Sequence, residues 1–242
     1  MSEIETGKRL VVEGNDGTGK STVADMLAWQ VQKNGFMTLR IDEPDSPINQ
    51  DGTVVFPSVS LLRIEIKDGS QAHNPHADLG MFNVSRFLSW TRVTKPYMEK
   101  GYWPIQSRDD TSSKAFQGGG DKLGIAYVDH TVRNFMNDDQ YFEPDFKTVL
   151  VFKDEIERLK RLESRSAPEK PDTFESRGAA FQDRVNRTYL EVAALENIDL
   201  THIEASQPRE EIANIVLEKV IGATGVKLVN YEWEEYWDSK NS

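Results

Sequence analysis

The chain has 242 residues, of which 38% are hydrophobic and 29% are charged, and it contains no cysteine. Lysine and arginine total 29 against 40 acidic residues, and the resulting net charge of −11 argues against a nucleic-acid partner. No apolar run approaches the roughly 20 residues of a membrane-spanning helix, and the first residues lack the pattern of a secretory signal. Together with the absence of disulfides, these features predict a cytoplasmic protein.

Short apolar runs alternate with longer stretches of helical periodicity, and this alternation predicts a parallel sheet wrapped by helices. The predicted strands are residues 8–14, 36–41, 102–107, 147–152 and 199–204. Residues 77–100 are predicted to form one long helix that Pro96 kinks or ends. The expected fold class is α/β, with a doubly wound, five-stranded parallel sheet in three layers.

We expect one domain over residues 1–222, because the chain has no internal repeat and no low-complexity linker. Residues 46–60 and 166–172 are rich in turn formers and are expected to be irregular loops. The C-terminal tail, residues 223–242, combines aromatic with acidic side chains and has no predicted role. Its aromatic residues are expected either to pack on the body of the protein or to be disordered.

Residues 11–22, VVEGNDGTGKST, contain the phosphate-binding pattern G-x-x-x-x-G-K-[ST] between a predicted strand and a predicted helix. In such a P-loop, backbone amides point at phosphate oxygens, Lys20 reaches the β and γ phosphates and Ser21 ligates Mg²⁺. We therefore expect a nucleoside triphosphate donor with Mg²⁺, held by Gly14, Asn15, Gly17, Thr18, Gly19, Lys20, Ser21 and Thr22. A GTP switch is not expected, because the guanine-reading pattern Asn-Lys-x-Asp is absent.

A second motif, WPIQSRDDTSSKAFQGGG at residues 103–120, resembles the corresponding segment of bacterial thymidylate kinases. The resemblance extends to EGNDGTGKST at 13–22, MFNVSR at 81–86, VTKPYMEKGYW at 93–103, RLKRLESR at 158–165 and FESRGAAFQDRVNRTYLEVA at 174–193, and it covers about residues 9–221. It implies a P-loop nucleoside monophosphate kinase fold with a short lid at about residues 158–174. It also implies a homodimer that transfers the γ-phosphoryl group of ATP to dTMP.

The resemblance assigns the acceptor site residue by residue. Phe82 matches the aromatic side chain that stacks on the pyrimidine, and Arg86, one helical turn later, matches the arginine that hydrogen-bonds the base. Arg108 matches the arginine that binds the acceptor phosphate, and Arg63 matches a second such arginine. The remaining acceptor residues are Asp16, which matches a carboxylate on the sugar hydroxyl, and Ser113, Phe116 and Gln117 around the nucleoside.

Transfer between two phosphates needs alignment and charge cancellation rather than a strong base, because the attacking oxygen is already anionic. The P-loop carries Thr18 and no arginine at its variable positions, so the transition-state cation is expected from the lid. Arg161 and Arg165 occupy the matching lid positions, with Arg158 as a reserve. The expected catalytic residues are Lys20, Arg108, Arg161 and Arg165.

Two positions depart from the family pattern. Ser107 stands where the family has an aspartate near the magnesium, and Asp42 stands where it has an acceptor-binding arginine. Arg40 shares a strand face with Asp42 and is a candidate replacement. An acid where the acceptor phosphate belongs leaves a second hypothesis open, a deoxynucleoside kinase in which Glu43 is the base for a neutral 5′-hydroxyl.

A third hypothesis, from another class, is a protein that binds ATP without turnover. Within the favoured hypothesis the base stays open among thymine, uracil and modified pyrimidines, because their discrimination depends on about one methyl group of packing. A dTMP kinase remains the favoured interpretation, since the motif at residues 103–120 and the segment at residues 174–193 both follow the thymidylate kinase pattern.

Overall fold

The structure, a computed structural model, describes residues 5–43, 62, 64–66, 73–163, 177–204 and 206–241. Its sheet has five strands, β1 (Leu10–Gly14), β2 (Thr38–Asp42), β3 (Trp103–Ser107), β4 (Phe146–Phe152) and β5 (Asp199–Ile203). All are parallel, in the order β2-β3-β1-β4-β5. The predicted α/β fold with a five-stranded parallel sheet is confirmed. The predicted loops at residues 46–60 and 166–172 lie outside the described residues.

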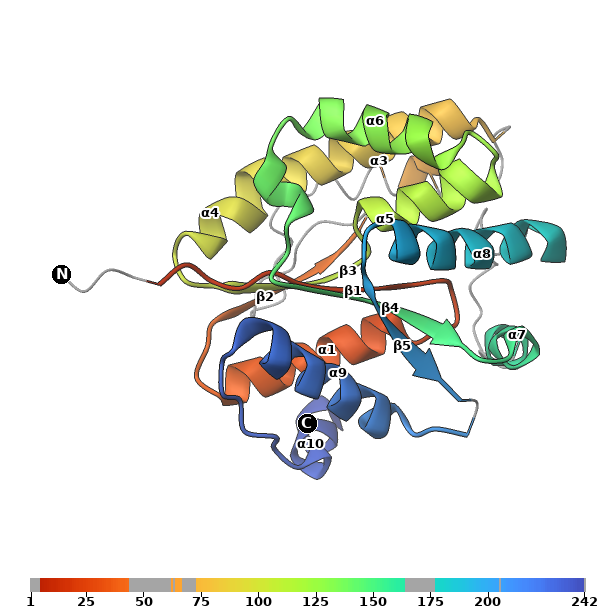
Figure 1. Ribbon diagram of the computed structural model, residues 1–242. Helices are drawn as coiled ribbons and strands as arrows, with labels where there is room; N and C mark the ends of the chain where they lie inside the picture. Colours follow the sequence, from red (N-terminus) through yellow and green to blue (C-terminus); the bar gives the residue numbers. More distant parts are fainter. Residues whose placement is uncertain are drawn as a thin grey trace.

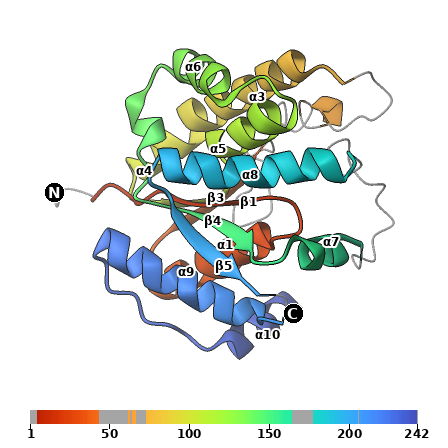
Figure 2. The same ribbon diagram turned by 45° about the vertical axis from the view of Figure 1, so that its right-hand side comes forward.

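Helices cover both faces of the sheet (Figures 1 and 2). One face carries α1 (Lys20–Lys33) and α9 (Arg209–Thr224), with α10 (Trp233–Asn241) outside them. The other carries α3 (Pro75–Ser89), α4 (Lys95–Met98), α5 (Asp110–Ser113), α6 (Ile125–Met136) and α8 (Ala179–Leu195), and α7 (Glu155–Glu163) lies beyond the end of β4. None of these described helices is long and apolar enough to cross a membrane.

The central strand β1 is buried at every position because helices cover it on both faces. Leu10 and Val12 belong to a core with α1 and α9, while Val149 of β4 faces a second core that includes Phe116 and Tyr189. The second core contains side chains from the predicted nucleoside-binding segment. Packing on this face therefore fixes the backbone beneath the candidate site.

The helix predicted at residues 77–100 begins at Pro75 and is divided into two α-helices, α3 and α4. Asn74 caps its start, since the Asn74 side chain accepts hydrogen bonds from the amides of residues 76 and 77 at 3.0 and 3.2 Å. A π-helical turn, η1 (Trp90–Thr94), separates α3 from α4. Pro96 has no amide proton to donate, and its ring would clash with the carbonyl group one helical turn earlier in a regular α-helix. The wider turn accommodates the proline, as the amide of Lys95 donates to the carbonyl of Trp90.

The C-terminal tail packs on the body of the protein. Tyr236 is buried in a cluster with Met26 of α1 and Ala213 of α9, and the Trp233 ring lies 5.8 Å from the Trp29 ring. The backbone of Tyr231 and the side-chain amide of Gln30 exchange hydrogen bonds of 2.7 and 2.9 Å. Of the two expectations for the tail, packing rather than disorder holds for its described residues.

Candidate active site

The candidate site lies where β1, β2 and β3 end, because the carboxyl ends of parallel strands meet at one edge of the sheet. β1 leads into the P-loop, β2 into Glu43 and β3 into Arg108. The two motifs, far apart in the sequence, are thus brought together by the topology alone. The strand register also places Asp42 opposite Ser107.

The P-loop has the backbone that its glycines permit. Gly14 has φ 144°, and a Cβ there would lie 2.8 Å from the carbonyl oxygen of Leu150, so β4 leaves no room for a side chain. Gly19 has φ 83° and is the N-cap of α1, which begins at Lys20. The positive end of α1 therefore points at the space that the P-loop encloses, as an anion site requires. Ser21 is exposed in the first turn.

Lys20 and Arg108 converge on Asp16. The Lys20 ammonium lies 3.1 Å from Asp16 Oδ1, and Arg108 Nη2 donates to the same oxygen. Burial and then the nearby charge of Arg108 lower the pKa of Lys20 to about 8. Two cations from the two motifs therefore meet around one anionic oxygen.

Arg108 has φ 76°, in the left-handed region that side chains rarely adopt. Its Nη1 donates to Ser112 Oγ at 3.0 Å, and its guanidinium lies 5.1 Å from the centre of the Phe116 ring. The next amide, that of Asp109, donates to the Glu13 carboxylate at 2.6 Å. Glu13 of β1 thus holds the strained turn through this hydrogen bond. The turn directs the Arg108 guanidinium back toward the P-loop.

Arg86 is buried at the centre of the predicted acceptor side, and all three nitrogens of its head donate hydrogen bonds, which use four of its five N–H groups. Nε donates to Glu43 Oε2 at 3.0 Å, Nη1 to Asn83 Oδ1 at 3.1 Å, and Nη2 to both Ser113 Oγ and the carbonyl of Asp109 at 3.1 Å. Burial opposes the charge of Arg86, but Glu43 and neighbouring acids outweigh it and hold its pKa above its usual range. The structure thus brings together three residues that were predicted to bind the acceptor: Glu43, Arg86 and Ser113.

Glu43 uses both of its carboxylate oxygens. Oε2 accepts from Arg86, and Oε1 accepts from Gln106 Nε2 at 2.9 Å. Burial raises the pKa of Glu43, while the charge of Arg86 lowers it in part. A carboxylate whose two oxygens both accept hydrogen bonds from buried side chains supports Arg86, and this disfavours the hypothesis that Glu43 is a base.

The predicted nucleoside wall forms one cluster. Phe82 is half-buried against a core that contains Phe116. Gln117 is 1% exposed, and neither atom of its side-chain amide makes a hydrogen bond within the described part of the chain. A buried amide without partners costs free energy unless a ligand supplies them, so Gln117 is a candidate contact for a polar base edge.

The predicted lid arginines differ in their surroundings. Arg158 is 1% exposed; its Nη1 donates to the carbonyl of Asp16, and its Nε donates to Glu155 at 2.9 Å. Arg161 is half-buried, with its guanidinium 4.8 Å from the centre of the Phe152 ring. Arg158 therefore contacts the P-loop directly. The other two predicted arginines, Arg63 and Arg165, lie outside the described residues.

The two departures from the family pattern adjoin each other. Ser107 Oγ donates to Asp42, and Arg40 Nη2 lies 3.0 Å from Asp42 Oδ1. Arg40 Nε also donates to Asp25 of α1 at 2.7 Å, and its Nη2 reaches the carbonyl of Ser21 at 3.4 Å. Arg40 thus contacts α1, which lies on the other face of the sheet from Arg86. These contacts place Arg40 beside the helix that follows the P-loop, where the ATP phosphates are expected.

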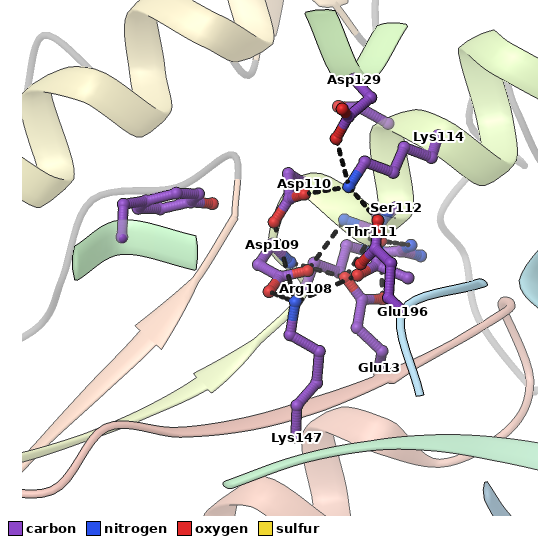
Figure 3. Close-up of polar contacts among 12 residues, drawn as sticks. Glu13, Arg108, Asp109, Asp110, Thr111, Ser112, Lys114, Asp129, Lys147 and Glu196 are labelled. Carbon is purple, nitrogen blue, oxygen red and sulfur yellow. Dashed lines mark hydrogen bonds and ion pairs between the residues drawn. The ribbon is translucent and has the colours of Figure 1, made fainter. Parts of the chain in front are cut away.

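Several buried charges behind the site were not predicted. Figure 3 shows Glu13, Asp109 and Lys147 in one network with Arg108. Burial would raise the pKa of Asp109, but Lys147 at 2.5 Å, the charge of Arg9 and the amide of Thr111 together outweigh it and hold the pKa below its usual range. The available sequence signal was a charged residue within an apolar strand, as at Glu13 in LVVEG and Lys147 in FKTVLVF.

A second network surrounds Lys114, whose side chain is fully buried (Figure 3). Its ammonium lies 2.7 Å from Asp110 and 2.8 Å from Asp129, and it also pairs with Glu196. The three carboxylates could together hold a metal ion, since their oxygens lie within 4.8 Å of one another. Lys114 already supplies the cation at their centre, which makes this cluster an internal ion network.

The parallel sheet has a P-loop at the carboxyl ends of its strands, a lysine and an arginine converge on one carboxylate oxygen, and the predicted nucleoside-binding residues form one buried cluster. These are the features of a P-loop kinase. A sequence model of the thymidylate kinase family matches residues 12–216. The chain is 31% identical over 208 residues to a thymidylate kinase of Blochmanniella pennsylvanica, covering 84% of this chain and 90% of that kinase. It is 27% identical over 215 residues to one of Idiomarina loihiensis, covering 89% and 97%. The chain belongs to the thymidylate kinase family.

Proposed function

We propose that the protein transfers the γ-phosphoryl group of ATP to the 5′-phosphate of dTMP, releasing ADP and dTDP. The observation that carries this proposal is the convergence of Lys20 and Arg108 on one oxygen of Asp16. A cation from the donor motif and one from the acceptor motif meet where a transferred phosphoryl group needs its charge cancelled. The family membership supports dTMP as the acceptor.

On the donor side, residues 14–22 bind the ATP phosphates, with Lys20 on the β and γ phosphates. On the acceptor side, Phe82 stacks on the pyrimidine, and Arg86 with Gln117 hydrogen-bonds it. The acceptor residues as a set are Asp16, Glu43, Arg63, Phe82, Arg86, Arg108, Ser113, Phe116 and Gln117. Glu43 acts there by holding Arg86, which its 3.0 Å contact supports.

Mg²⁺ is the proposed cofactor. The donor set fits it, because the Ser21 hydroxyl at the start of α1 and the half-exposed Asp42 carboxylate at the end of β2 are both hard oxygen ligands. Arg40 Nη2 lies 3.0 Å from Asp42 Oδ1 and 3.4 Å from the carbonyl oxygen of Ser21, so both residues border the Arg40 guanidinium. Bound there, Mg²⁺ would neutralise phosphate charge on ATP, and Asp42 would provide the carboxylate that position 107 lacks.

The lid, residues 158–174, is proposed to supply the remaining positive charge. Arg161 and Arg165 are the proposed transition-state cations, and an arginine in this role accelerates phosphoryl transfer by about 10³ to 10⁵. Arg158 instead fixes the P-loop, as its bond to the carbonyl of Asp16 indicates. We further propose that residues 1–222 form one domain, that the protein is a homodimer, and that it is cytoplasmic.

A coupled ADP-release assay with ATP and Mg²⁺ tests the proposal, run in parallel with dTMP, dUMP, the other deoxynucleoside monophosphates and thymidine. Turnover with dTMP and none with thymidine is the expected result. Lys20→Ala is the control and loses nearly all turnover, because the phosphate-binding ammonium is gone. Turnover with thymidine alone would contradict the proposal and restore Glu43 as a base, and equal rates for the parent and Lys20→Ala would identify a contaminant.

A further inference from the structure

Glu13, the fourth residue of β1, is a fully buried acid directly before the phosphate-binding pattern, and that pattern gives it no role. Its carboxylate accepts hydrogen bonds from the amide of Asp109 at 2.6 Å and from that of Ser112 at 3.1 Å. It also accepts from the hydroxyls of Ser112 at 2.8 Å and Tyr189 at 3.1 Å. These donors come from the turn after β3, from α5 and from α8, so one carboxylate joins three segments around Arg108. Figure 3 shows Glu13 beside Arg108, Asp109 and Ser112.

The two hydroxyls lie between Glu13 and the head of Arg108. Arg108 Nη1 donates to Ser112 Oγ at 3.0 Å and to Tyr189 Oη at 3.4 Å. The hydroxyl oxygens of Ser112 and Tyr189 are 2.9 Å apart. These two hydroxyl groups therefore link the Arg108 guanidinium to the Glu13 carboxylate, and their orientation affects how well they bind the guanidinium.

Proton counting fixes that orientation. A hydroxyl carries one proton and two lone pairs, and a guanidinium can only donate. When Glu13 is ionised, both hydroxyl protons point at its carboxylate, and lone pairs of Ser112 and Tyr189 face Arg108. If Glu13 is neutral, its own proton is donated to one of the two hydroxyl oxygens, and the proton of that hydroxyl must turn away from the carboxyl toward the other hydroxyl or Arg108. The hydroxyl pair then no longer has a negative charge behind it, and it binds the guanidinium less strongly.

We propose that Glu13 is a positioning residue for acceptor phosphorylation: as a carboxylate it orients the hydroxyls of Ser112 and Tyr189, which in turn hold Arg108 toward the acceptor phosphate. This inference rests on the proposed function, in which Arg108 binds that phosphate. Glu13 itself touches neither substrate.

The surroundings of Glu13 make its charge sensitive to pH near neutrality. Burial, and then the charge of Asp109, raise the pKa of Glu13 to about 7, against the opposing effect of Arg108. The charged or titratable groups that face it are Arg108 and Asp109 after β3, Asp16 in the P-loop, Lys20 of α1 and Tyr189 of α8. The hold on Arg108 is therefore expected to weaken as the pH falls below about 7.

The variant Glu13→Gln keeps the shape of the side chain and removes the charge. We expect its KM for dTMP to rise about tenfold or more, with the KM for ATP changed less than twofold, since Arg108 serves the acceptor. Tyr189→Phe removes one relay hydroxyl and raises the same KM, and the double variant is expected to be no worse than the poorer single one. Glu191→Gln, an exposed change on α8 two residues from Tyr189, is the matched control.

The pH profile separates this role from a merely structural one. The ratio of kcat/KM for dTMP between Glu13→Gln and the parent is expected to approach one as the pH falls from 8 to 6, because the parent loses the carboxylate in that range. The ratio cancels the ionisation of the acceptor phosphate itself, whose pKa is about 6. A pH-independent ratio, or equal increases in the KM for ATP and dTMP, would overturn the proposal.

A readout without turnover distinguishes failure of this inference from failure of the proposed function. In the parent, the side-chain ¹⁵N NMR signal of Arg108 should shift with a midpoint near pH 7, apart from the response near pH 8 that Lys20 produces through Asp16. The component near pH 7 should be absent in Glu13→Gln and retained in Glu191→Gln. If the parent does not phosphorylate dTMP, the proposed function fails, while this titration still tests the link between Glu13 and Arg108. An Arg108 signal that does not titrate near pH 7 in the parent would refute that link, as would one that titrates equally there in Glu13→Gln.

Discussion

Replacing Lys114 by methionine tests the internal ion network that lies behind the site. Met keeps the length and apolar stem of the side chain but removes the ammonium that contacts Asp110 and Asp129 and pairs with Glu196. Lys114 and Asp110 are almost completely buried, whereas the side chains of Asp129 and Glu196 are 31% and 28% exposed. The variant therefore leaves one deeply buried carboxylate and two partly hydrated ones without their cation.

The expected loss follows from this burial. Removing one partner of a buried ion pair costs about 3–5 kcal/mol, and the partial hydration of two of the acids favours the lower end, about 3 kcal/mol at pH 7. Lys153 is the matched control, because it also pairs with a glutamate, Glu204, but both side chains are about 60% exposed. Lys153→Met is expected to cost less than about 1 kcal/mol.

Urea unfolding of the parent and both variants, repeated from pH 7 to pH 4, measures these differences. Burial opposes ionisation of Asp129, but the hydrogen bonds and charges of Lys114 and Arg133 together outweigh burial and lower its pKa below the ordinary value of 3.8, so this part of the stabilisation persists through the measured range and is lost only below it. Acid neutralises the carboxylates that Lys114→Met leaves unpaired. The deficit of Lys114→Met should therefore shrink toward pH 4, and a deficit below about 1 kcal/mol at pH 7 would refute the reasoning.

Three further predictions concern the P-loop, the glycine run and the tail. Burial lowers the pKa of Lys20 to about 8. The charge of Lys20 in the folded, ligand-free protein therefore lowers the free energy of unfolding by on the order of 3 kcal/mol at pH 7. Lys20→Met should therefore raise the unfolding free energy while abolishing turnover, and the gain should vanish as the pH rises through 8 toward 10.5; a destabilised variant would contradict this. A Cβ at Gly119 would lie 1.8 Å from Thr188 Oγ1, so Gly119→Ala should cost about 1–3 kcal/mol, and adding Thr188→Gly should recover part of it in urea unfolding. Removing residues 233–242 strips the aromatic cover from Trp29 and should lower the melting temperature, and an unchanged value would contradict the packing role.

The sequence predicted the features that depend on local pattern. Apolar runs predicted the five strands, and the glycine spacing predicted the P-loop, because both signals lie within a few consecutive residues. The pairing of Arg86 with Ser113 was accessible through the family resemblance, which covers both segments. The π-helical turn before Pro96 was not, since proline predicts an interruption without specifying its form.

The networks behind the site could not be predicted, because their contacts join distant segments. Glu13 contacts Tyr189 from the other end of the chain, and Lys114 contacts Glu196. The strand pattern placed Arg40 on one face with Asp42, but only the fold assigns that face to α1. Charges inside apolar strands were the one available signal, and a single sequence does not say which partners neutralise them.

The most direct test of the account identifies the product of a single incubation. The protein with ATP, Mg²⁺ and dTMP, followed by chromatography and mass spectrometry of the nucleotides, should form dTDP in step with ADP, and it should form no dTMP when thymidine replaces dTMP. ADP without dTDP, or phosphorylation of thymidine, would contradict the central claim that Lys20 and Arg108 together serve transfer between two phosphates.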